Sequence, residues 1–264
     1  MKIFIEGVGV LGSGLCGWES SQNIMAGTTP YIDAALVIPP SDLLPSAERR
    51  RTGIPVKLAL AVGCEAIAQA QRRASELPTV FASSAADCDN IHCIFDMLSK
   101  NGREVSPTRF HNSVHNAPSG YWSIATKSMA PSTSLACFDA SFVAGLIEAA
   151  TQTRARGKEV VLIAYDAAYP QPLHALRPIS AIFGVALVLT GDKTNRALAE
   201  LEISISRKSI ASSPMAIAEL EAMRIGNPAA RSLPLLAAIA TQTPENICFD
   251  YIAGNQLDVV VRPC

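Results

Sequence analysis

The sequence predicts a layered α/β fold. Two continuous apolar runs, residues 160–164 and 185–189, have the pattern of strands that are covered on both faces. Stretches with helical spacing of apolar residues alternate with such runs, and this order packs helices in layers against a sheet. The chain has 264 residues, 49% of them hydrophobic and only 17% charged, which fits a large core or a buried subunit surface.

The first segments read as a strand, a turn and two helices. Residues 2–6 predict a buried strand that runs into a glycine-rich turn, and residues 20–26 predict a short helix. Prolines mark residues 39–45 as a loop. We expect a long helix over residues 55–73, with Pro55 in its first turn.

A second strand and helix follow this long helix. Residues 78–82 predict a strand. Asn90 is a suitable cap for a helix that docks through Phe95 and Leu98, and Asn101 with Gly102 is suited to end it.

Further on, apolar residues nearly encircle a helix over residues 138–150, including Phe138, and this pattern predicts a central, fully buried helix. We expect another helix from Ser213 to Gly226 and a closing strand over residues 257–261.

Charge and composition exclude several classes of function. A net charge of −1 gives no field that attracts nucleic acid or an anionic membrane. Glu6 interrupts the first apolar run, which argues against a signal peptide, and the uncharged stretch 178–191 is shorter than the ~20 residues of a membrane span. The seven scattered cysteines indicate reduced thiols, so we expect a cytoplasmic protein.

Gly7, Gly9 and Gly12 fit the G-x-G-x-x-G pattern of dinucleotide-binding turns. That interpretation needs a helix opening on the third glycine, and the glycines that follow weaken such a start. Asp33 is a poor candidate for the ribose-binding acid because Pro30 lies close before it. Dinucleotide binding therefore stays a minor alternative, and we expect no cofactor.

Two groups contain metal-ligating residue types: Cys88, His92 and Cys93, and the pair His111 and His115. A zinc site needs three or four ligands in tetrahedral geometry. His92 and Cys93 are adjacent, so on a helix they point about 100° apart. We therefore expect no metal site.

Cys137 is the strongest candidate for chemistry. It follows the turn-rich segment 131–134 and precedes the apolar helix. The start of a helix favours a thiolate, although free cysteines are more commonly inert core residues. A nucleophile also needs a base and an oxyanion site.

In order and spacing, these segments resemble the amino-terminal half of a β-ketoacyl synthase, which has the thiolase-like α/β/α fold. The resemblance is carried by the opening strand with Gly7, Gly9 and Gly12, by Arg49–Arg51 before the long helix, and by the segments 106–120, 131–137, 160–164 and 177–189. It implies one domain over residues 1–264, with a complete half over 1–207 and a strongly shortened second half over 208–264. It also implies that Cys137 occupies the position of the acyl-accepting cysteine.

The chain departs from this family in its histidines. The family's two catalytic histidines lie in His-Gly-Thr and Asn-x-x-Gly-His contexts, and neither context surrounds His92, His111, His115 or His174. Residues 253–256 stand where the family has a glycine-rich loop, in reduced form. We therefore expect no condensation by this chain alone.

The resemblance implies a partner. Ketosynthases pair through the strand before the nucleophile, and some pair with a degenerate chain-length-factor subunit, as in aryl polyene pathways that use acyl carrier protein. By that resemblance we expect a heterodimer with a full-length ketosynthase, in which this chain shapes the acyl tunnel. Candidate pocket or interface residues are Phe110, Tyr121, Trp122 and Met129, with ordinary core packing as the alternative. The competing hypothesis is an independent small acyltransferase that uses Cys137 with His111 or His115 as base.

Overall fold

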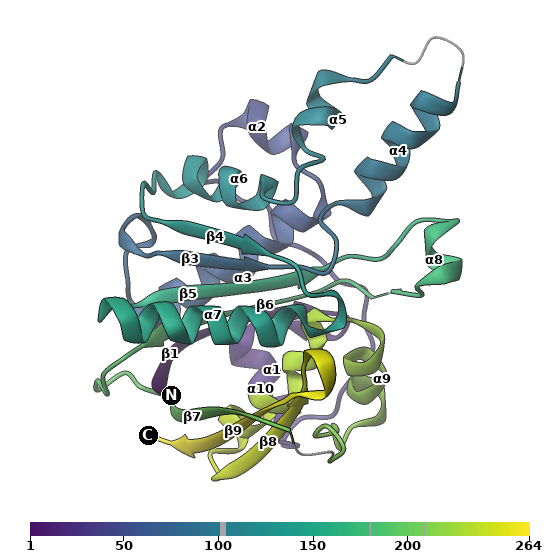
Figure 1. Ribbon diagram of the computed structural model, residues 1–264. Coiled ribbons are helices and arrows are strands. Elements are labelled where there is room, and N and C mark those ends of the chain that lie inside the picture. Colours follow the sequence, from purple (N-terminus) through teal and green to yellow (C-terminus); the bar gives the residue numbers. More distant parts are fainter. Residues whose placement is uncertain (101–103, 180, 208–209) are drawn as a thin grey trace.

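The computed structural model describes residues 1–100, 104–179, 181–207 and 210–264. Within these residues one mixed sheet has the strand order β4-β3-β5-β6-β1-β7-β9-β8, and β2 pairs with β1 (Figure 1). The strands are β1 (Lys2–Gly12), β2 (Leu15–Cys16), β3 (Thr79–Ala82), β4 (Ser132–Leu135), β5 (Val160–Asp166), β6 (Phe183–Thr190), β7 (Ala199–Ser206), β8 (Glu245–Asp250) and β9 (Gln256–Pro263). β3 runs parallel to β4 and β5, and the other neighbours are antiparallel.

Helices cover both faces of the sheet. The helices are α1 (Trp18–Met25), α2 (Ser46–Arg51), α3 (Ile54–Ala70), α4 (Cys88–Ser99), α5 (Pro107–His111), α6 (Ala117–Thr126), α7 (Ser141–Arg156), α8 (Leu173–Leu176), α9 (Ala218–Gly226) and α10 (Leu233–Thr241). Short 3-10 turns are η1 (Ala74–Glu76), η2 (Phe138–Ala140), η3 (Ala229–Ser232) and η4 (Ile252–Gly254).

Two separate hydrophobic cores fill the space between these layers. One core holds α3 and α6 against the sheet, and the other holds α7, α1 and α10 against its opposite face. The result is the layered α/β fold that the apolar runs predict, with the α/β/α arrangement that the resemblance implies (Figure 1). β8 and β9 come from the segment 208–264 and extend the same sheet, while the boundary at residue 208 itself lies outside the described residues.

Several predicted elements are confirmed. The helices expected at residues 20–26 and 55–73 correspond to α1 and α3, and Pro55 lies in the first turn of α3. The strands expected at 78–82 and 257–261 correspond to β3 and β9. The two apolar runs form β5 and β6, in which every residue is buried.

The glycine-rich turn predicted after residue 6 is wrong, because β1 continues as a strand through Gly12. A Cβ on Gly7 would stand 2.1 Å from the carbonyl oxygen of Ala66, and one on Gly9 would stand 2.1 Å from that of Val62. These glycines let α3 lie directly on the sheet. The chain turns into β2 instead of a helix after Gly12, so the arrangement that a dinucleotide turn requires is not formed there.

The predicted cap of α4 is also wrong. Asp87 caps this helix, since its side chain accepts a hydrogen bond from the backbone of Asn90 at 3.0 Å. Asn90 instead donates its side-chain amide to the carbonyl of Arg109 at 2.8 Å, which ties α4 to α5. α4 ends at Ser99, and the predicted stop at Asn101 and Gly102 lies outside the described residues.

Phe138 does not belong to the buried helix that the apolar pattern predicts. α7 begins at Ser141, whereas Phe138 lies in η2 with its side chain 66% exposed. α7 is buried mainly up to Ala150, and its last turns reach solvent at Thr151 and Arg154. The apolar pattern therefore describes only the first part of the helix.

The helix expected from Ser213 begins later, at Ala218. Ser213 instead bonds to the sheet, because its backbone N–H donates to the carbonyl of Cys248 in β8 at 2.9 Å. Its hydroxyl oxygen accepts the N–H of Cys248 at 3.0 Å. The segment before α9 thus lies along the outer edge of β8.

No helix in the described part of the chain is long and apolar enough to cross a bilayer.

Candidate functional site

Cys137 lies in a tight turn between β4 and α7. Its backbone N–H donates to the hydroxyl oxygen of Ser141 at 3.0 Å, and that hydroxyl donates to the carbonyl of Phe138 at 2.7 Å. Ser141 therefore closes the turn with both of its hydrogen-bonding roles. The sequence correctly places this cysteine before a buried helix, but the segment 131–134, interpreted as turn-rich, belongs mainly to the strand β4.

The expected preference of Cys137 for the thiolate is wrong. Burial raises the pKa of the Cys137 thiol. α7 begins four residues later, at Ser141, and the single 3-10 turn between them is too short to build a substantial helix dipole. The backbone N–H of Cys137 itself is already used by Ser141.

The histidines considered as bases are engaged elsewhere. His115 lies with Nε2 3.1 Å from the carbonyl oxygen of Ser83, and the His111 ring packs edge-on against Tyr121 at 6.4 Å. Among the residues that the structure describes, neither ring shares a hydrogen bond with Cys137. The pair that an independent acyltransferase needs is therefore not assembled by a hydrogen bond.

Two arginines bind an aspartate of the turn, and the sequence does not identify these three residues as part of the site. Arg177 donates to the Asp139 carboxylate at 2.8 Å, and Arg231 lies 3.3 Å from the other oxygen of the same carboxylate. The guanidinium carbon of Arg177 also lies 3.5 Å from the centroid of the Phe138 ring. These residues come from three distant segments and so leave no local motif in the sequence.

Asp166 lies at the end of β5 and is 2% exposed. One of its oxygens accepts three hydrogen bonds, from the hydroxyls of Ser83 and Ser84 and from the backbone of Ser84. The other oxygen is buried and has no hydrogen-bond partner in the described part of the chain. Burial raises the pKa of Asp166 to about 6, although the serine hydrogen bonds oppose that rise.

The segment at residues 253–256 follows a tyrosine whose pKa is affected by the charge of Cys137. This tyrosine is Tyr251, two residues before the segment, and its pKa is raised by burial and then by the charge of Cys137. The backbone of Tyr251 donates to the carbonyl of Asn255 at 2.9 Å, which closes the loop on itself. The segment that follows residue 209 therefore supplies a tyrosine and an arginine to the surroundings of Cys137, and it contains no histidine.

The strand before the turn, β4, is one edge of the sheet. It pairs with β3 only, and its residues are exposed or half-buried. The carbonyls of Pro131 and Leu135 accept hydrogen bonds from the β3 segment. Because backbone groups alternate in direction along a strand, those of Ser132 and Ser134 face outward.

The four candidate interface residues divide into two pairs. Met129, just before β4, is 97% exposed, and Phe110 on α5 is 68% exposed. Tyr121 and Trp122 are each 2% exposed and pack in the core. Trp122 meets the Phe81 ring edge-on, and Tyr121 donates its hydroxyl to Asn112 at 3.0 Å.

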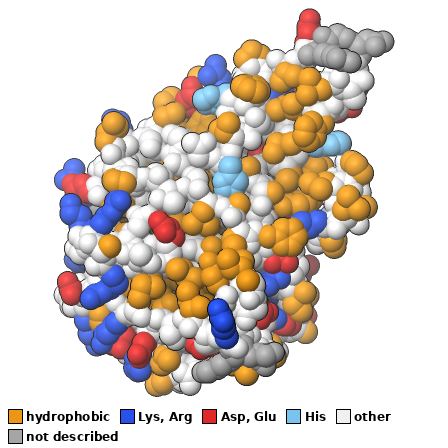
Figure 2. All heavy atoms as spheres, in the orientation of Figure 1, with side chains coloured by type: hydrophobic (Ala, Val, Ile, Leu, Met, Phe, Trp, Pro, Cys, Tyr) orange, Lys and Arg blue, Asp and Glu red, His pale blue; other side chains and the backbone are white. Residues whose placement is uncertain are grey.

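An apolar groove of about 590 Å³ runs along α5 and α6, next to the β4 edge. Phe110, Val114 and Ile124 line it with exposed side chains, and Tyr121 forms part of its wall. In Figure 2, hydrophobic side chains gather at the upper right of the molecule, over the region of α4, α5 and α8.

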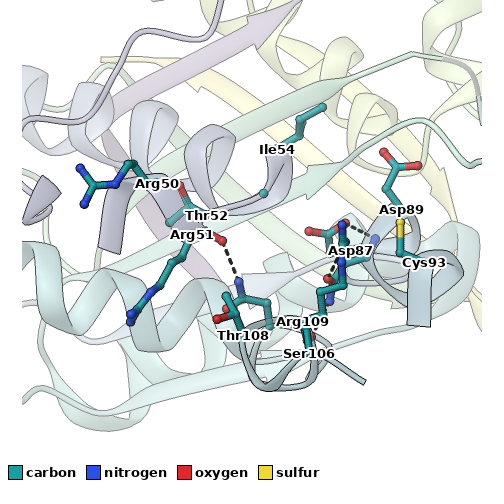
Figure 3. Close-up of a pocket in the computed structure, with 13 residues that line it drawn as sticks. Arg50, Arg51, Thr52, Ile54, Asp87, Asp89, Cys93, Ser106, Thr108 and Arg109 are labelled. Atoms are coloured by element: carbon teal, nitrogen blue, oxygen red, sulfur yellow. Dashed lines mark hydrogen bonds between the residues drawn. The ribbon is translucent and has the colours of Figure 1, made fainter. Parts of the chain in front are cut away.

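A second, polar pocket of about 470 Å³ lies between the start of α3, α4 and α5 (Figure 3). Arg50, Arg51 and Arg109 line it together with Asp87 and Asp89. Two hydrogen bonds build its walls, because the backbone carbonyl of Arg51 accepts from Asn112 and that of Arg109 from Asn90. The sequence singles out Arg49–Arg51, Asn90, Cys93 and the segment 106–120 for other reasons and does not predict this pocket.

The cysteine–histidine groups do not form a metal site. No cluster of three or more metal-ligating side chains occurs among the described residues. Burial and nearby acids raise the pKa of Cys88 to about 11, which opposes the thiolate that a metal needs. The predicted docking of α4 through Phe95 and Leu98 is wrong, since these side chains are 64% and 42% exposed. Phe95 lines a hollow of about 490 Å³ between α4 and α8 instead.

Comparison with known proteins links this geometry to one family. Residues 18–244 match the family model described as β-ketoacyl synthase, N-terminal domain. Among curated proteins, no significant match is found.

Three solved structures share the fold. The ketosynthase (ApeO) in complex with its chain length factor (ApeC) from Xenorhabdus doucetiae has a TM-score of 0.73 and 22% identity, over 98% of this chain and 99% of the matched chain. The ishigamide ketosynthase/chain length factor has a TM-score of 0.73 and 14% identity, over 100% and 99%. A type II PKS acyl-carrier protein in complex with its ketosynthase bound to the hexaketide has a TM-score of 0.75 and 10% identity, over 100% and 99%.

Proposed function

The chain belongs to the β-ketoacyl synthase family through the family's amino-terminal domain, and we propose that it is a non-condensing, chain-length-factor-like subunit of a type II ketosynthase. In this role residues 1–264 act as one ketosynthase-like domain, in which the segment 208–264 completes the sheet begun by 1–207. The partner is a full-length ketosynthase, and the two form a cytoplasmic heterodimer. The substrate is a polyketide or fatty-acyl chain of the aryl polyene type, carried by acyl carrier protein, and this subunit shapes its tunnel.

The open edge of β4 carries this proposal. An unpaired edge strand presents free N–H and C=O groups to another strand, and proteins normally protect such an edge. Here Ser132 and Ser134 direct their backbone groups outward, and the exposed Met129 precedes the strand by three residues. A second strand that pairs along β4 would satisfy these groups and cover that methionine.

The apolar groove along α5 and α6 continues the same surface. Its lining contains no Lys, Arg, Asp or Glu side chain, and Phe110, Val114 and Ile124 are 68%, 48% and 47% exposed. Apolar, charge-poor patches of this kind are typical of the centre of subunit interfaces. Phe110 and Met129 are therefore our candidates for partner contact, and the buried Tyr121 and Trp122 support the groove from behind.

The surroundings of Cys137 support the non-condensing part of the proposal. Condensation needs imidazole and amide donors at the developing enolate, and loss of one such donor typically costs about 10²–10³ in rate. Arg177 and Arg231 bind Asp139 in the turn, the charge of Cys137 affects Tyr251, and burial raises the pKa of the thiol. The two arginines hold the turn together, and none of these groups is an imidazole of a condensing site.

Strand pairing at β4 is tested by one backbone change. Ser134→Pro removes an outward N–H and leaves the bonds to β3 intact, since proline is tolerated on an edge strand in this orientation. Ser134→Thr, which keeps the N–H, is the matched control. Each variant is co-expressed with a full-length ketosynthase from the same source and analysed by size-exclusion chromatography.

We expect a stable one-to-one complex for the unchanged chain and for Ser134→Thr, and separate peaks for Ser134→Pro. Equal complex formation by the proline variant would exclude pairing through β4. Intact-protein mass after incubation of the isolated chain with an acyl donor tests the independent acyltransferase. Rapid acylation followed by release of the acyl group would favour that alternative.

A further inference from the structure

Phe138 has a backbone conformation that an aromatic residue rarely adopts. Its φ is +51°, in the left-handed region. Of the other described non-glycine residues with positive φ, Gln71, Lys127 and Gln242 are helix C-caps, where this conformation is common. Phe138 follows a strand and has no such reason to be left-handed. The conformation therefore persists only because its surroundings hold it.

Arg177 makes two contacts with this turn. Its guanidinium carbon lies 3.5 Å from the centroid of the Phe138 ring, a distance at which cation and ring attract each other. The same guanidinium donates to the carboxylate of the next residue, Asp139, at 2.8 Å. One side chain thus contacts both residues that follow Cys137.

The position of Arg177 is itself fixed. Its side chain is 16% exposed and lies 5.8 Å from the ring of Tyr169, which stands on the connection between β5 and β6. The Tyr169 hydroxyl is 3.1 Å from that of Ser84, which in turn donates to Asp166 at 2.6 Å. The arginine is therefore anchored to the end of β5.

The segment after residue 209 holds the turn from the other side. Arg231 lies 3.3 Å from the second oxygen of Asp139. Asn227 fixes the turn η3 that carries this arginine, because its amide donates to Ala181 and its carbonyl oxygen accepts from Ala229, both at 2.9 Å. Asp139 is thereby bridged by two cations from separate parts of the chain.

We propose that Arg177 is a positioning residue for Cys137: it clamps Phe138 in the left-handed conformation by stacking on its ring and by fixing Asp139. The clamp sets how far the turn can open and hence how accessible the thiol is. This role does not depend on pairing with another subunit.

The clamp is tested on the whole isolated chain by the rate at which iodoacetamide alkylates Cys137, followed by mass spectrometry of its peptide. Arg177→Met, which removes stacking and charge, is expected to raise this rate about fivefold, given the usual strength of exposed cation–π and ion pairs. Arg177→Lys keeps a charge for Asp139 but lacks the flat face, and an intermediate rate is expected. The exposed Cys16 and Cys264 provide internal references, whose rates stay unchanged.

Arg154→Met is the matched control, because Arg154 donates to the carbonyl of Gly191 and stands near the end of α7 that is remote from the turn. Its alkylation rate at Cys137 is expected to equal that of the unchanged protein. If Arg177→Met does not fold, Phe138→Leu provides a second test, because it removes the aromatic ring on which Arg177 stacks, at an exposed position. This variant is also expected to raise the alkylation rate of Cys137.

The variant Phe138→Gly distinguishes a clamping role of Arg177 from a general structural role. Glycine adopts positive φ without strain, so the turn keeps its shape in Phe138→Gly without a clamp. Adding Arg177→Met to Phe138→Gly is therefore expected to leave the alkylation rate unchanged. If Arg177→Met raised the rate equally in the unchanged chain and in the Phe138→Gly variant, the proposal would be overturned. An unchanged rate in Arg177→Met alone would overturn it as well.

Discussion

Gly9 lies against the backbone of Val62, so closely that a Cβ at position 9 would stand 2.1 Å from the carbonyl oxygen of that valine. Gly7, on the same face of β1, makes the same approach to Ala66. Two residues without side chains thus let α3 settle on the centre of the sheet. The backbone of the helix, and not a flexible side chain, occupies the space that a larger residue would need.

Gly9→Ala is therefore expected to destabilise the protein by about 3 kcal/mol, because the helix has to move away from the sheet. The measurement is the free energy of unfolding from urea denaturation. Gly120→Ala is the control: nothing lies within 4 Å of the new Cβ, and alanine favours a helix interior by roughly 0.5–1 kcal/mol. Unchanged stability of Gly9→Ala would show that α3 does not lie on β1 as described.

Asp166 predicts a pH dependence of stability. Burial raises the pKa of this carboxyl from its usual 3.8 to about 6 in the folded protein, so the folded state binds the proton more tightly than the unfolded chain. The stabilisation that this proton provides is complete below about pH 4 and is lost as the pH rises through about 6. A pKa difference of this size corresponds to about 3 kcal/mol.

Asp166→Asn carries no such proton and imitates the neutral carboxyl. Relative to the unchanged protein, its free energy of unfolding is expected to gain about 2 kcal/mol between pH 4 and pH 7, as measured by urea titrations at each pH. Asp42→Asn, at a side chain that is 91% exposed, provides the surface control. A difference between Asp166→Asn and the unchanged protein that stays constant with pH would disprove the buried, proton-binding state.

Cys137→Ala tests whether the thiol takes part in condensation by the proposed complex. If the partner's active site performs the reaction, turnover is expected to fall by less than about tenfold, whereas removal of a true nucleophile typically costs about 10⁴ or more. The assay is product formation by the assembled complex, after size-exclusion chromatography has confirmed assembly. Abolished turnover in an intact complex would contradict the non-condensing role.

Patterns that depend on local burial can be read correctly from the sequence. Residues 160–164 of β5 and 185–189 of β6 are apolar and buried at every position, and this is visible in a short window. The continuation of β1 through its glycines cannot be read in this way, because glycine weakens an isolated strand and only the approach of α3 explains it. Glu6 looks like an interruption of the first strand, but it is 1% exposed and paired with Arg72 at 2.7 Å, a partner that lies far away in the sequence.

The candidate site also contains both residues that the sequence identifies and residues that only the fold brings together. Cys137 is identified from the sequence because its neighbours in the chain define the turn. Arg177, Arg231 and Asp139 are not, because the fold alone brings them together. The predicted direction of the thiol pKa is also wrong, since one 3-10 turn separates Cys137 from the helix that follows it.

The two edge strands of the sheet, β8 and β4, differ in whether another strand can pair with their outward backbone groups. Along β8, Ser213 already occupies the middle of the outer border through its two hydrogen bonds with Cys248. Along β4, the outward backbone groups of Ser132 and Ser134 have no neighbouring strand among the described residues. Each molecule can therefore add a partner strand at one edge of its sheet but not at the other. Assembly by strand addition therefore stops at a closed pair and cannot propagate into a filament.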